Sequence, residues 1–383
     1  MEFVFDELAP REEILNQKDA IKQVFDLVKS KKNLVLYGKR NRAKTSIIKN
    51  IIIPDFIKLS KNNLAVYVEL MRVRDAEDLS ERLTREFTMA YGKFSKVSKL
   101  FNDTLSFFKG LSPSYEISPT GDQSISFKAD NGSSVIQYID LLERISKLAT
   151  KKGLRVLLCF DEFQDIALSK DGPQLESNLR RLFESSPSDM SILISGSKQH
   201  LLADMFESPN APFFKFGMRV ALKEIAYDEY ISYIRDRLKG KRKKTPDDTL
   251  KYLQDKLFRS PEEIHRIGYT ANSGPDRPLK DSDIDSFVER YLEGASDSLE
   301  TRISQLNDSQ YIVLKLIAFS QNNNLAEPFA KDNLKKSGKS QNAIAKALSQ
   351  LLDYGFIEKT KKGYQMSDPF LYYYIRKSRV ALT

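Results

Sequence analysis

Residues 34–48 read LVLYGKRNRAKTSII, and this stretch decides the fold of the first part of the chain. Residues 34–37 are apolar and short, as in a buried strand, and the residues from Lys44 onward suit a helix. A loop that opens with Gly38 joins the two. In this order of strand, loop and helix, the backbone N–H groups of the loop and the positive end of the helix hold phosphate groups. The stretch therefore predicts a phosphate-binding loop of the Walker A type.

The residues expected to bind the nucleotide in this loop are Gly38, Lys39, Arg40, Asn41, Arg42, Ala43, Lys44, Thr45 and Ser46. Lys44 is expected to reach the β and γ phosphates and to act in catalysis, and the hydroxyl of Thr45 is expected to ligate magnesium. Ala43 stands where the usual motif has glycine. A helical backbone accepts alanine, so we expect the change to be tolerated, with weaker nucleotide affinity. The alternative interpretation is a basic turn before an ordinary helix.

A second motif ends the apolar stretch LRVLLCF at residues 154–160, where Asp161 and Glu162 follow directly. Ligands of parallel sheets bind beyond the carboxyl ends of the strands, so this acidic pair and the glycine loop should face one crevice. Asp161 is then expected to hold magnesium, and Glu162 to orient and deprotonate the water that attacks the γ phosphate. A solvated strand end is the alternative. Together the two motifs predict magnesium-dependent ATP binding and hydrolysis to ADP and phosphate, a reaction that can be slow given Ala43.

Two further residues are candidates for catalysis. Ser195 ends the apolar stretch 191–195, and a hydroxyl there can donate to the γ phosphate or to the attacking water. Arg219 precedes a strand-like stretch at 220–225, and its cation can stabilise charge on the transferred phosphoryl group as an arginine finger. Composition alone explains both residues equally well, Ser195 as a polar strand end and Arg219 as half of a surface salt bridge.

The composition of the chain argues against several other classes of protein. The chain has 383 residues, of which 41% are hydrophobic and 30% charged, which indicates more than one globular domain and not a disordered chain. Its apolar runs are too short for a membrane span, and its first residues do not resemble a secretory signal, so we expect a cytoplasmic protein. The single cysteine, Cys159, excludes an internal disulfide. The two histidines, His200 and His265, are not spaced as zinc ligands.

The order of strands and helices predicts an α/β fold, with a mostly parallel P-loop NTPase sheet in residues 1–220. An insertion is expected at about 91–134, where short alternating runs suggest a β-hairpin. Strand signals vanish after residue 220, and helical periodicity predicts a helical lid over 221–298. Residues 299–383 then predict a separate domain.

This last domain has the pattern of a winged helix-turn-helix. Helices are expected after Asn307 or Asp308, at about 327–336 and from Ser340, followed by two strands around the turn at 361–363. Residues 327–383 contain 11 Lys or Arg against 5 Asp or Glu, within a chain of net charge +9. We expect this domain to bind duplex DNA through Gln341, Asn342, Lys346, Lys361 and Lys362. The alternative is a winged helix that contacts protein or packs against its own ATPase domain.

With these motifs the chain resembles a known group, the archaeal-type ATPases of the STAND and AAA+ P-loop class. These proteins are similar in layout to origin-recognition ATPases. The resemblance rests on residues 11–12, 34–48, 157–167 and 194–206, and on the C-terminal winged helix. It implies that Arg11 and Glu12 lie near the adenine pocket and that Gln164 lies just past the catalytic carboxylate. It also suggests Arg277 as a second sensor, although the segment 273–278 departs from the pattern of the group.

Two functions outside simple DNA-linked hydrolysis remain open from the sequence. The first is a signalling switch in which the winged helix binds protein and the nucleotide controls formation of a homo-oligomer. The second is a nucleotide-binding scaffold that no longer hydrolyses, which the departure at Ala43 suggests.

Overall fold

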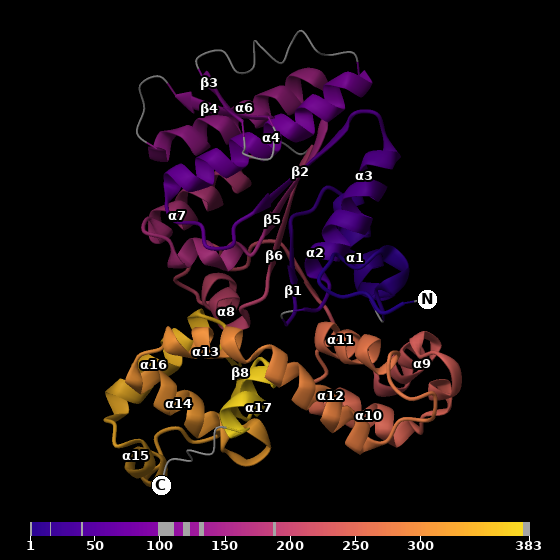
Figure 1. The fold of residues 1–383 in the computed structure, drawn as a ribbon. Coiled ribbons are helices and arrows are strands. Elements are labelled where there is room, and N and C mark those ends of the chain that lie inside the picture. Colours follow the sequence, from indigo (N-terminus) through magenta and orange to yellow (C-terminus); the bar gives the residue numbers. More distant parts are fainter. Residues whose placement is uncertain are drawn as a thin grey trace. The chain divides into compact units, whose positions relative to one another are not determined.

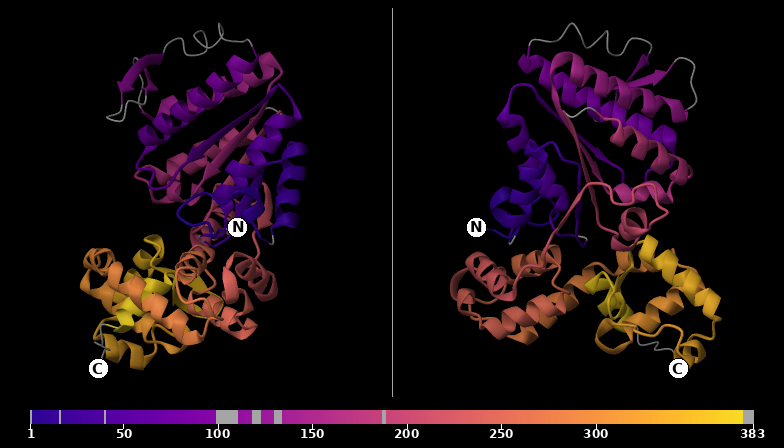
Figure 2. Two further views of the ribbon diagram at one scale, coloured as in Figure 1. Left: turned by 45° about the vertical axis from the view of Figure 1, so that its right-hand side comes forward. Right: turned by 180° about the vertical axis from the view of Figure 1, so that it is seen from behind.

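The computed structural model describes residues 2–15, 17–39, 41–98, 111–117, 123–129, 134–186 and 189–377. Two compact units divide the chain: one is Leu8–Glu224, and the other joins Met1–Glu7 to Ile225–Thr383. Figure 1 shows the elements of both units, and Figure 2 shows them from two further sides. The finer division into core, lid and winged helix at residues 220 and 298 stays a prediction.

The unit Leu8–Glu224 is built on a five-stranded parallel sheet with the strand order β2, β5, β6, β1, β7. Three of its strands match the apolar stretches 34–37, 154–160 and 191–195 to within one residue at each end. The bounds are β1 (Leu34–Tyr37), β2 (Asn63–Glu69), β5 (Arg155–Asp161), β6 (Met190–Gly196) and β7 (Met218–Ala221). This sheet, connected by helices, confirms the predicted α/β class.

The fifth strand differs from the prediction. A strand-like stretch was expected at 220–225, but β7 begins at Met218 and ends at Ala221. Pairing sets these bounds, because β7 lies beside β1 and matches its four residues from Leu34 to Tyr37 one for one. Arg219 therefore lies inside the strand, opposite Val35, and not before it.

Helices cover both faces of the sheet (Figure 1). One face carries α1 (Lys18–Lys29) and a continuous helical run made of α2 (Lys44–Ile47), the π-helical η2 (Ile48–Ile52) and α3 (Ile53–Leu59). The other face carries α4 (Ala76–Ser98), α6 (Ser134–Lys152) and α7 (Gly172–Glu184). Val24 and Val28, one helical turn apart on α1, are fully buried. The amphipathic pattern of residues 18–29 thus places α1 against the sheet.

Strand β5 lies inside the sheet, and both of its faces are covered. Leu157 and Cys159 belong to the core under α1, whereas Leu158 and Phe160 belong to the core under α4, α6 and α7. This double burial explains why its sequence is a continuous apolar run and not an alternating one. The run ends where the carboxylate of Asp161 lies at the carboxyl edge of the sheet.

Three short elements complete this unit: η1 (Arg11–Glu13), η3 (Phe163–Leu168) and α8 (Gln199–Glu207). Between α4 and α6 the chain forms an antiparallel hairpin of β3 (Leu111–Ile117) and β4 (Gln123–Ala129). The remainder of the predicted insertion, at 99–110, 118–122 and 130–133, lies outside the described residues.

The second unit begins with a helical group that also holds the chain's first residues. Phe3 lies so close to Gly268 that a side-chain carbon at that position would be 2.5 Å from the phenyl ring. Arg266 pairs with the carboxylate of Asp6. The elements of this group are α9 (Tyr227–Arg237), η4 (Gly240–Lys244), α10 (Asp247–Lys256), α11 (Pro261–Ala271), α12 (Asp281–Gly294) and α13 (Ser296–Ser304).

The C-terminal part of the second unit has the winged helix order. Asn307 caps its first helix through a capping box with Gln310, and Ser340 caps the third helix. The elements are α14 (Asp308–Ala318), η5 (Gln321–Asn323), α15 (Lys331–Ser337), α16 (Gln341–Asp353), β8 (Ile357–Thr360), β9 (Gly363–Met366) and α17 (Pro369–Lys377). Across the part of the chain that the structure describes, no helix combines the length and apolar character that a membrane span requires.

Candidate functional site

The phosphate loop follows β1 and folds around the side chain of Lys44. The Lys44 ammonium group donates to the carbonyl oxygens of Gly38 at 3.0 Å and of Lys39 at 2.8 Å. Lys44 is 5% exposed, so its charge lies inside the loop. The buried cation of Lys44 therefore lies at the carboxyl end of β1, where an anionic ligand can be bound.

The backbone at Ala43 corrects one prediction. We expected a helical conformation, but Ala43 has φ 58° and ψ 19°, which is left-handed. The chain reverses at this position before it enters α2, and glycine adopts that conformation without steric cost. The methyl group of alanine costs about 1 to 2 kcal/mol there. The departure from the usual motif therefore strains the loop directly.

The acidic end of β5 meets this loop. Thr45 Oγ1 donates to Asp161 Oδ2 at 2.5 Å, and the hydroxyl of Tyr67 on β2 donates to the same oxygen at 2.8 Å. Ser195 Oγ donates to Asp161 Oδ1 at 2.5 Å. Asp161 is 1% exposed. The two predicted motifs thus converge on one buried carboxylate.

The environment of Asp161 also affects Tyr67. Burial raises the pKa of the Tyr67 hydroxyl far above its ordinary value, and the negative charge of Asp161 raises it further. The protonated phenol is therefore favoured, which keeps the hydroxyl available as a donor to Asp161. Nothing in the sequence had singled out Tyr67, because its position on a neighbouring strand only emerges from the sheet order.

The residues around Asp161 fit a magnesium ion. Mg²⁺ prefers hard oxygen ligands and retains several water molecules, so one hydroxyl and one carboxylate suffice from the protein. Thr45 and Asp161 supply these two groups on facing elements, α2 and β5, with their oxygens in direct contact. The pair can hold the ion between them if their mutual hydrogen bond opens.

Glu162 is held differently from Asp161. Its backbone is left-handed, with φ 52°, and its Oε2 accepts hydrogen bonds from Gln164 Nε2 at 2.6 Å and from Ser197 Oγ at 2.7 Å. The sequence had indicated Ser195 for contact with the reacting groups, but Ser195 is fully buried behind Asp161. Ser197, two residues later, is the hydroxyl that reaches Glu162. No strand pattern in the sequence pointed to it, because Ser197 lies just after β6, which ends at Gly196.

The other loop residues have varied partners. Arg42 donates to Glu224 Oε1 at 3.2 Å, and Lys39 Nζ lies 3.9 Å from the same oxygen. Ser46 Oγ accepts a hydrogen bond from the backbone N–H of Ala9 at 3.1 Å. Asn41 is exposed and has φ 56°, a conformation that asparagine tolerates better than most residues. Arg40 lies outside the described residues.

Three other predicted arginines have partners of their own. Arg11 in η1 pairs with Asp55 on α3 at 2.6 Å, beside Glu12, so this segment lies along the helical run that follows the phosphate loop. Arg219 bonds to Glu207 and to the carbonyl of Phe206 on α8. Its recorded bonds do not reach the phosphate loop or Asp161. The remaining arginine, Arg277, forms a bidentate pair with Asp283 at 2.8 Å.

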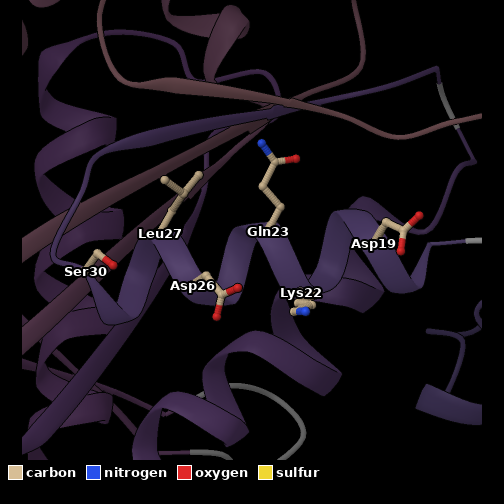
Figure 3. A pocket seen from close by; sticks show the side chains of 6 residues that line it. All are labelled: Asp19, Lys22, Gln23, Asp26, Leu27 and Ser30. Carbon is tan, nitrogen blue, oxygen red and sulfur yellow. The ribbon is translucent and has the colours of Figure 1, made fainter.

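A surface cavity on α1 is separate from these motifs (Figure 3). It measures about 350 Å³ and is open to solvent, and the side chains that line it belong to α1 and to Ser30, the residue directly after it. They are Asp19, Lys22, Gln23, Asp26, Leu27 and Ser30. None of these residues takes part in the contacts around Lys44 or Asp161, so we do not assign the cavity to the site.

The predicted DNA-binding residues lie on the winged helix surface. On α16, Gln341, Asn342 and Lys346 are exposed, while Ile344 and Leu348 are buried against the domain. Lys361 and Lys362 are exposed at the turn between β8 and β9. The helix and the wing therefore present polar and cationic groups to solvent.

Comparisons with known proteins agree with this architecture. A family model described as "Probable winged helix domain" matches residues 297–377. No curated protein is similar enough in sequence to count as a relative.

Similar solved structures extend over nearly the whole chain. A Walker-type ATPase of Pyrococcus abyssi has a TM-score of 0.64 at 16% identity, and the match covers 98% of this chain and 100% of that one. The ORC2 protein of Aeropyrum pernix, solved as ADPNP-ADP complexes, has a TM-score of 0.54 at 14% identity, covering 97% and 96%. The ORC1 protein of the same organism, solved in complex with DNA, has a TM-score of 0.50 at 11% identity, covering 96% and 94%.

Identities this low establish the fold and leave function to be argued from the residues. These matches cover 96 to 98% of this chain, so they span both the parallel-sheet unit and the C-terminal winged helix. The chain has the fold of the P-loop ATPases, with a winged helix domain at its C-terminus.

Proposed function

We propose that the protein is a magnesium-dependent ATPase whose nucleotide state controls a DNA-binding winged helix. The observation that carries the proposal is the 2.5 Å contact between Thr45 Oγ1 and Asp161 Oδ2, directly beside the buried Lys44. It brings a P-loop lysine, a hydroxyl and a strand-end carboxylate together, which is the set of groups that phosphoryl transfer from ATP requires.

Each of these groups has a distinct role in the proposed reaction. Lys44 exchanges its two loop carbonyls for the β and γ phosphates, and Thr45 and Asp161 hold the metal ion. Magnesium, when bound, neutralises charge that develops on the phosphate oxygens. Glu162 orients a water molecule and accepts its proton during in-line attack. Ser195 keeps the carboxylate of Asp161 in place through its hydrogen bond.

Arg219 stays a candidate arginine finger. To act on a phosphoryl group it would have to give up Glu207 and the Phe206 carbonyl. Such an exchange fits a nucleotide-dependent homo-oligomer, in which the guanidinium group serves either its own site or that of a neighbouring subunit.

DNA binding is proposed from the winged helix surface. The exposed Gln341 and Asn342 on α16 have the donors and acceptors that read base edges in a major groove. Lys346, Lys361 and Lys362 are suited to phosphate contacts, which position a protein on the duplex. The similar ORC1 protein, solved in complex with DNA, supports this assignment.

The test of the ATPase combines two variants with one control. Lys44→Ala should abolish ATP binding, measured by calorimetry. Glu162→Gln should bind ATP and lose turnover by a factor of about 10² to 10⁴, as expected for loss of a general base. Lys58→Ala, at an exposed position on α3, is the control and should match the wild type. Unchanged turnover in Glu162→Gln would discard the mechanism.

A second function is favoured by exposed aromatic residues on the winged helix. Tyr354, at the end of α16, is 61% exposed, and Phe329, before α15, is 39% exposed. Aromatic side chains are enriched in protein interfaces, so the domain would serve as a protein-binding element of a nucleotide-dependent switch. Binding to duplex DNA that weakens steeply with salt would rule out this second function as the main role of the domain, whereas no binding at low salt would favour it.

A further inference from the structure

Gln164 is a buried polar residue directly behind the acidic pair. It lies in η3, and its side chain is 0% exposed. Its Nε2 donates to Glu162 Oε2 at 2.6 Å and lies 3.2 Å from Asp165 Oδ1. One side-chain amide thus contacts two carboxylates.

The orientation of this amide is fixed by chemistry. Only the NH₂ group can face two carboxylates, so the carbonyl oxygen must point the other way. Gln164 Oε1 accordingly lies against Gly196, where a side-chain carbon would be 2.0 Å away. That oxygen is buried and accepts no hydrogen bond from the described residues. A buried acceptor without a donor destabilises a fold.

The groups around Gln164 tie two loops to Glu162. Ser197, after β6, donates to the same oxygen of Glu162. Asp165 accepts from Lys198 Nζ at 2.9 Å and from the backbone N–H of Arg72 at 2.7 Å. Asp165 is therefore anchored by the loops that follow β6 and β2, and it fixes the position of Gln164 in turn.

Glu162 needs such support. Its left-handed backbone places its side chain outside the regular geometry of a strand end. Among the described residues, the recorded side-chain bonds of its carboxylate all involve Oε2. Holding this one oxygen leaves Oε1 to accept a proton.

We infer that Gln164 is a positioning residue for Glu162, which holds Oε2 so that Oε1 meets the attacking water. The inference deepens the proposed function and rests on it. Gln164 does not contact the nucleotide in this scheme, and it acts through Glu162 alone. The chain thus keeps a destabilising buried acceptor at position 164 because the opposite end of the amide aligns the general base.

The experiment measures kcat and KM for ATP in the full-length protein. Gln164→Leu should lower kcat about 10-fold to 100-fold, because misplacement of a reacting group by about 1 Å has an effect of this size. KM should stay within about twofold of the wild type, since phosphate and metal contacts are untouched. The matched control is Gln254→Leu on α10, another glutamine at 0% exposure whose Oε1 lacks a partner within the described chain. It should leave kcat unchanged.

A double variant separates positioning from general destabilisation. In the Glu162→Gln background, Gln164→Leu should cause no further loss of kcat, because the two residues act as one unit. Ser197→Ala, at a partly exposed position, removes the second donor and should lower kcat in the same way, while Ser197→Thr keeps the hydroxyl and should restore it. Ser197→Ala decides the question if Gln164→Leu fails to fold.

The outcomes distinguish the two proposals. A wild-type protein that binds ATP but does not hydrolyse it overturns the proposed function, and the role of Gln164 with it. An active wild type in which both Gln164→Leu and Ser197→Ala retain full kcat overturns the role of Gln164 alone. The role of Gln164 is also overturned if Gln164→Leu lowers kcat equally in the Glu162→Gln background. A rise in KM instead of a fall in kcat has the same consequence.

Discussion

At the carboxylate of Asp161, four donors meet. Thr45 and Tyr67 donate to Oδ2, and Ser195 and the backbone N–H of Glu162 donate to Oδ1. A buried carboxylate is tolerated in a fold when its oxygens are hydrogen-bonded in this way. The same donors fix the direction of both oxygens, so the carboxylate is oriented before any ligand arrives.

The first residue-scale prediction concerns Ala43. Ala43→Gly removes the steric cost of the left-handed backbone, although glycine loses more conformational entropy on folding. We expect the free energy of unfolding to rise by up to about 1 kcal/mol and ATP affinity to increase. Urea unfolding and calorimetry measure the two quantities.

The matched variant at this position is Ala43→Val. A β-branched residue is disfavoured further at positive φ, so it should lower both stability and affinity. Equal stabilities for Ala43→Gly and Ala43→Val would show that the left-handed backbone at residue 43 is not maintained in solution.

At this scale the sequence predicted which groups of the candidate site come together and missed the residues that support them. Lys44, Thr45, Asp161 and Glu162 stand in recognisable order along the chain, so their types and spacing sufficed. Tyr67 reaches Asp161 from β2, and Ser197 reaches Glu162 from the loop after β6, so both contacts follow only from the order of strands in the sheet.

At the scale of elements, pairing and burial decide what the sequence leaves open. Strand β5 was predicted to within one residue because both of its faces are buried and the apolar run is continuous. Strand β7 was misplaced because its length is set by the four residues of β1 beside it, not by its own composition. Three of its four residues are exposed, so burial does not mark where the strand begins and ends.

Helix α11 carries a pH-dependent prediction within the second unit. Burial, together with the negative charge of Asp368 just before α17, raises the pKa of Glu263 from 4.5 to about 7. The neutral form is thus favoured in the folded state, so this contribution to stability is fully present below pH 4.5 and is lost as the pH rises through about 7. The loss is about 3 kcal/mol at most, from about 1.4 kcal/mol per pKa unit.

Glu263→Gln keeps the shape of the side chain and removes its charge. It should flatten the fall in melting temperature of this unit between pH 4.5 and pH 7. Glu262→Gln, on the adjacent and more exposed residue, is the control and should leave the fall in place. If Glu263→Gln leaves the fall in melting temperature between pH 4.5 and pH 7 unchanged, another group causes that fall.

At the scale of the whole molecule, the salt dependence of binding by the positively charged winged helix distinguishes DNA binding from protein binding. Each lysine that contacts a phosphate releases counterions and adds about 1 to the slope of log affinity against log salt. Lys361→Ala combined with Lys362→Ala should therefore reduce this slope by about 2 and weaken binding across all duplex sequences. Fluorescence anisotropy with labelled DNA over a salt series measures both quantities.

The control for this prediction is Lys147→Ala on α6, where the lysine side chain is 79% exposed. It should leave the slope unchanged. If the slope of log affinity against log salt is the same for the wild type and for the double variant of Lys361 and Lys362, the DNA contacts lie on another surface.

The overall architecture was predictable from sequence because its parts have local signals. The phosphate loop and β5 indicated the ATPase core, and the helix caps at Asn307 and Ser340 indicated the winged helix. The attachment of Phe3 and Asp6 to α11 was not predictable, because it joins the chain's first residues to a helix more than 250 positions away and depends on the absence of a side chain at Gly268.

The central claim is that the phosphate loop and the end of β5 enclose the triphosphate of ATP and its metal ion. The most direct measurement is a crystal structure of the protein with a non-hydrolysable ATP analogue and magnesium. We expect the γ phosphate to contact the Lys44 ammonium group and the metal ion to lie between the oxygens of Thr45 and Asp161. A nucleotide bound elsewhere, with the 2.5 Å contact between Thr45 and Asp161 still intact, would contradict it.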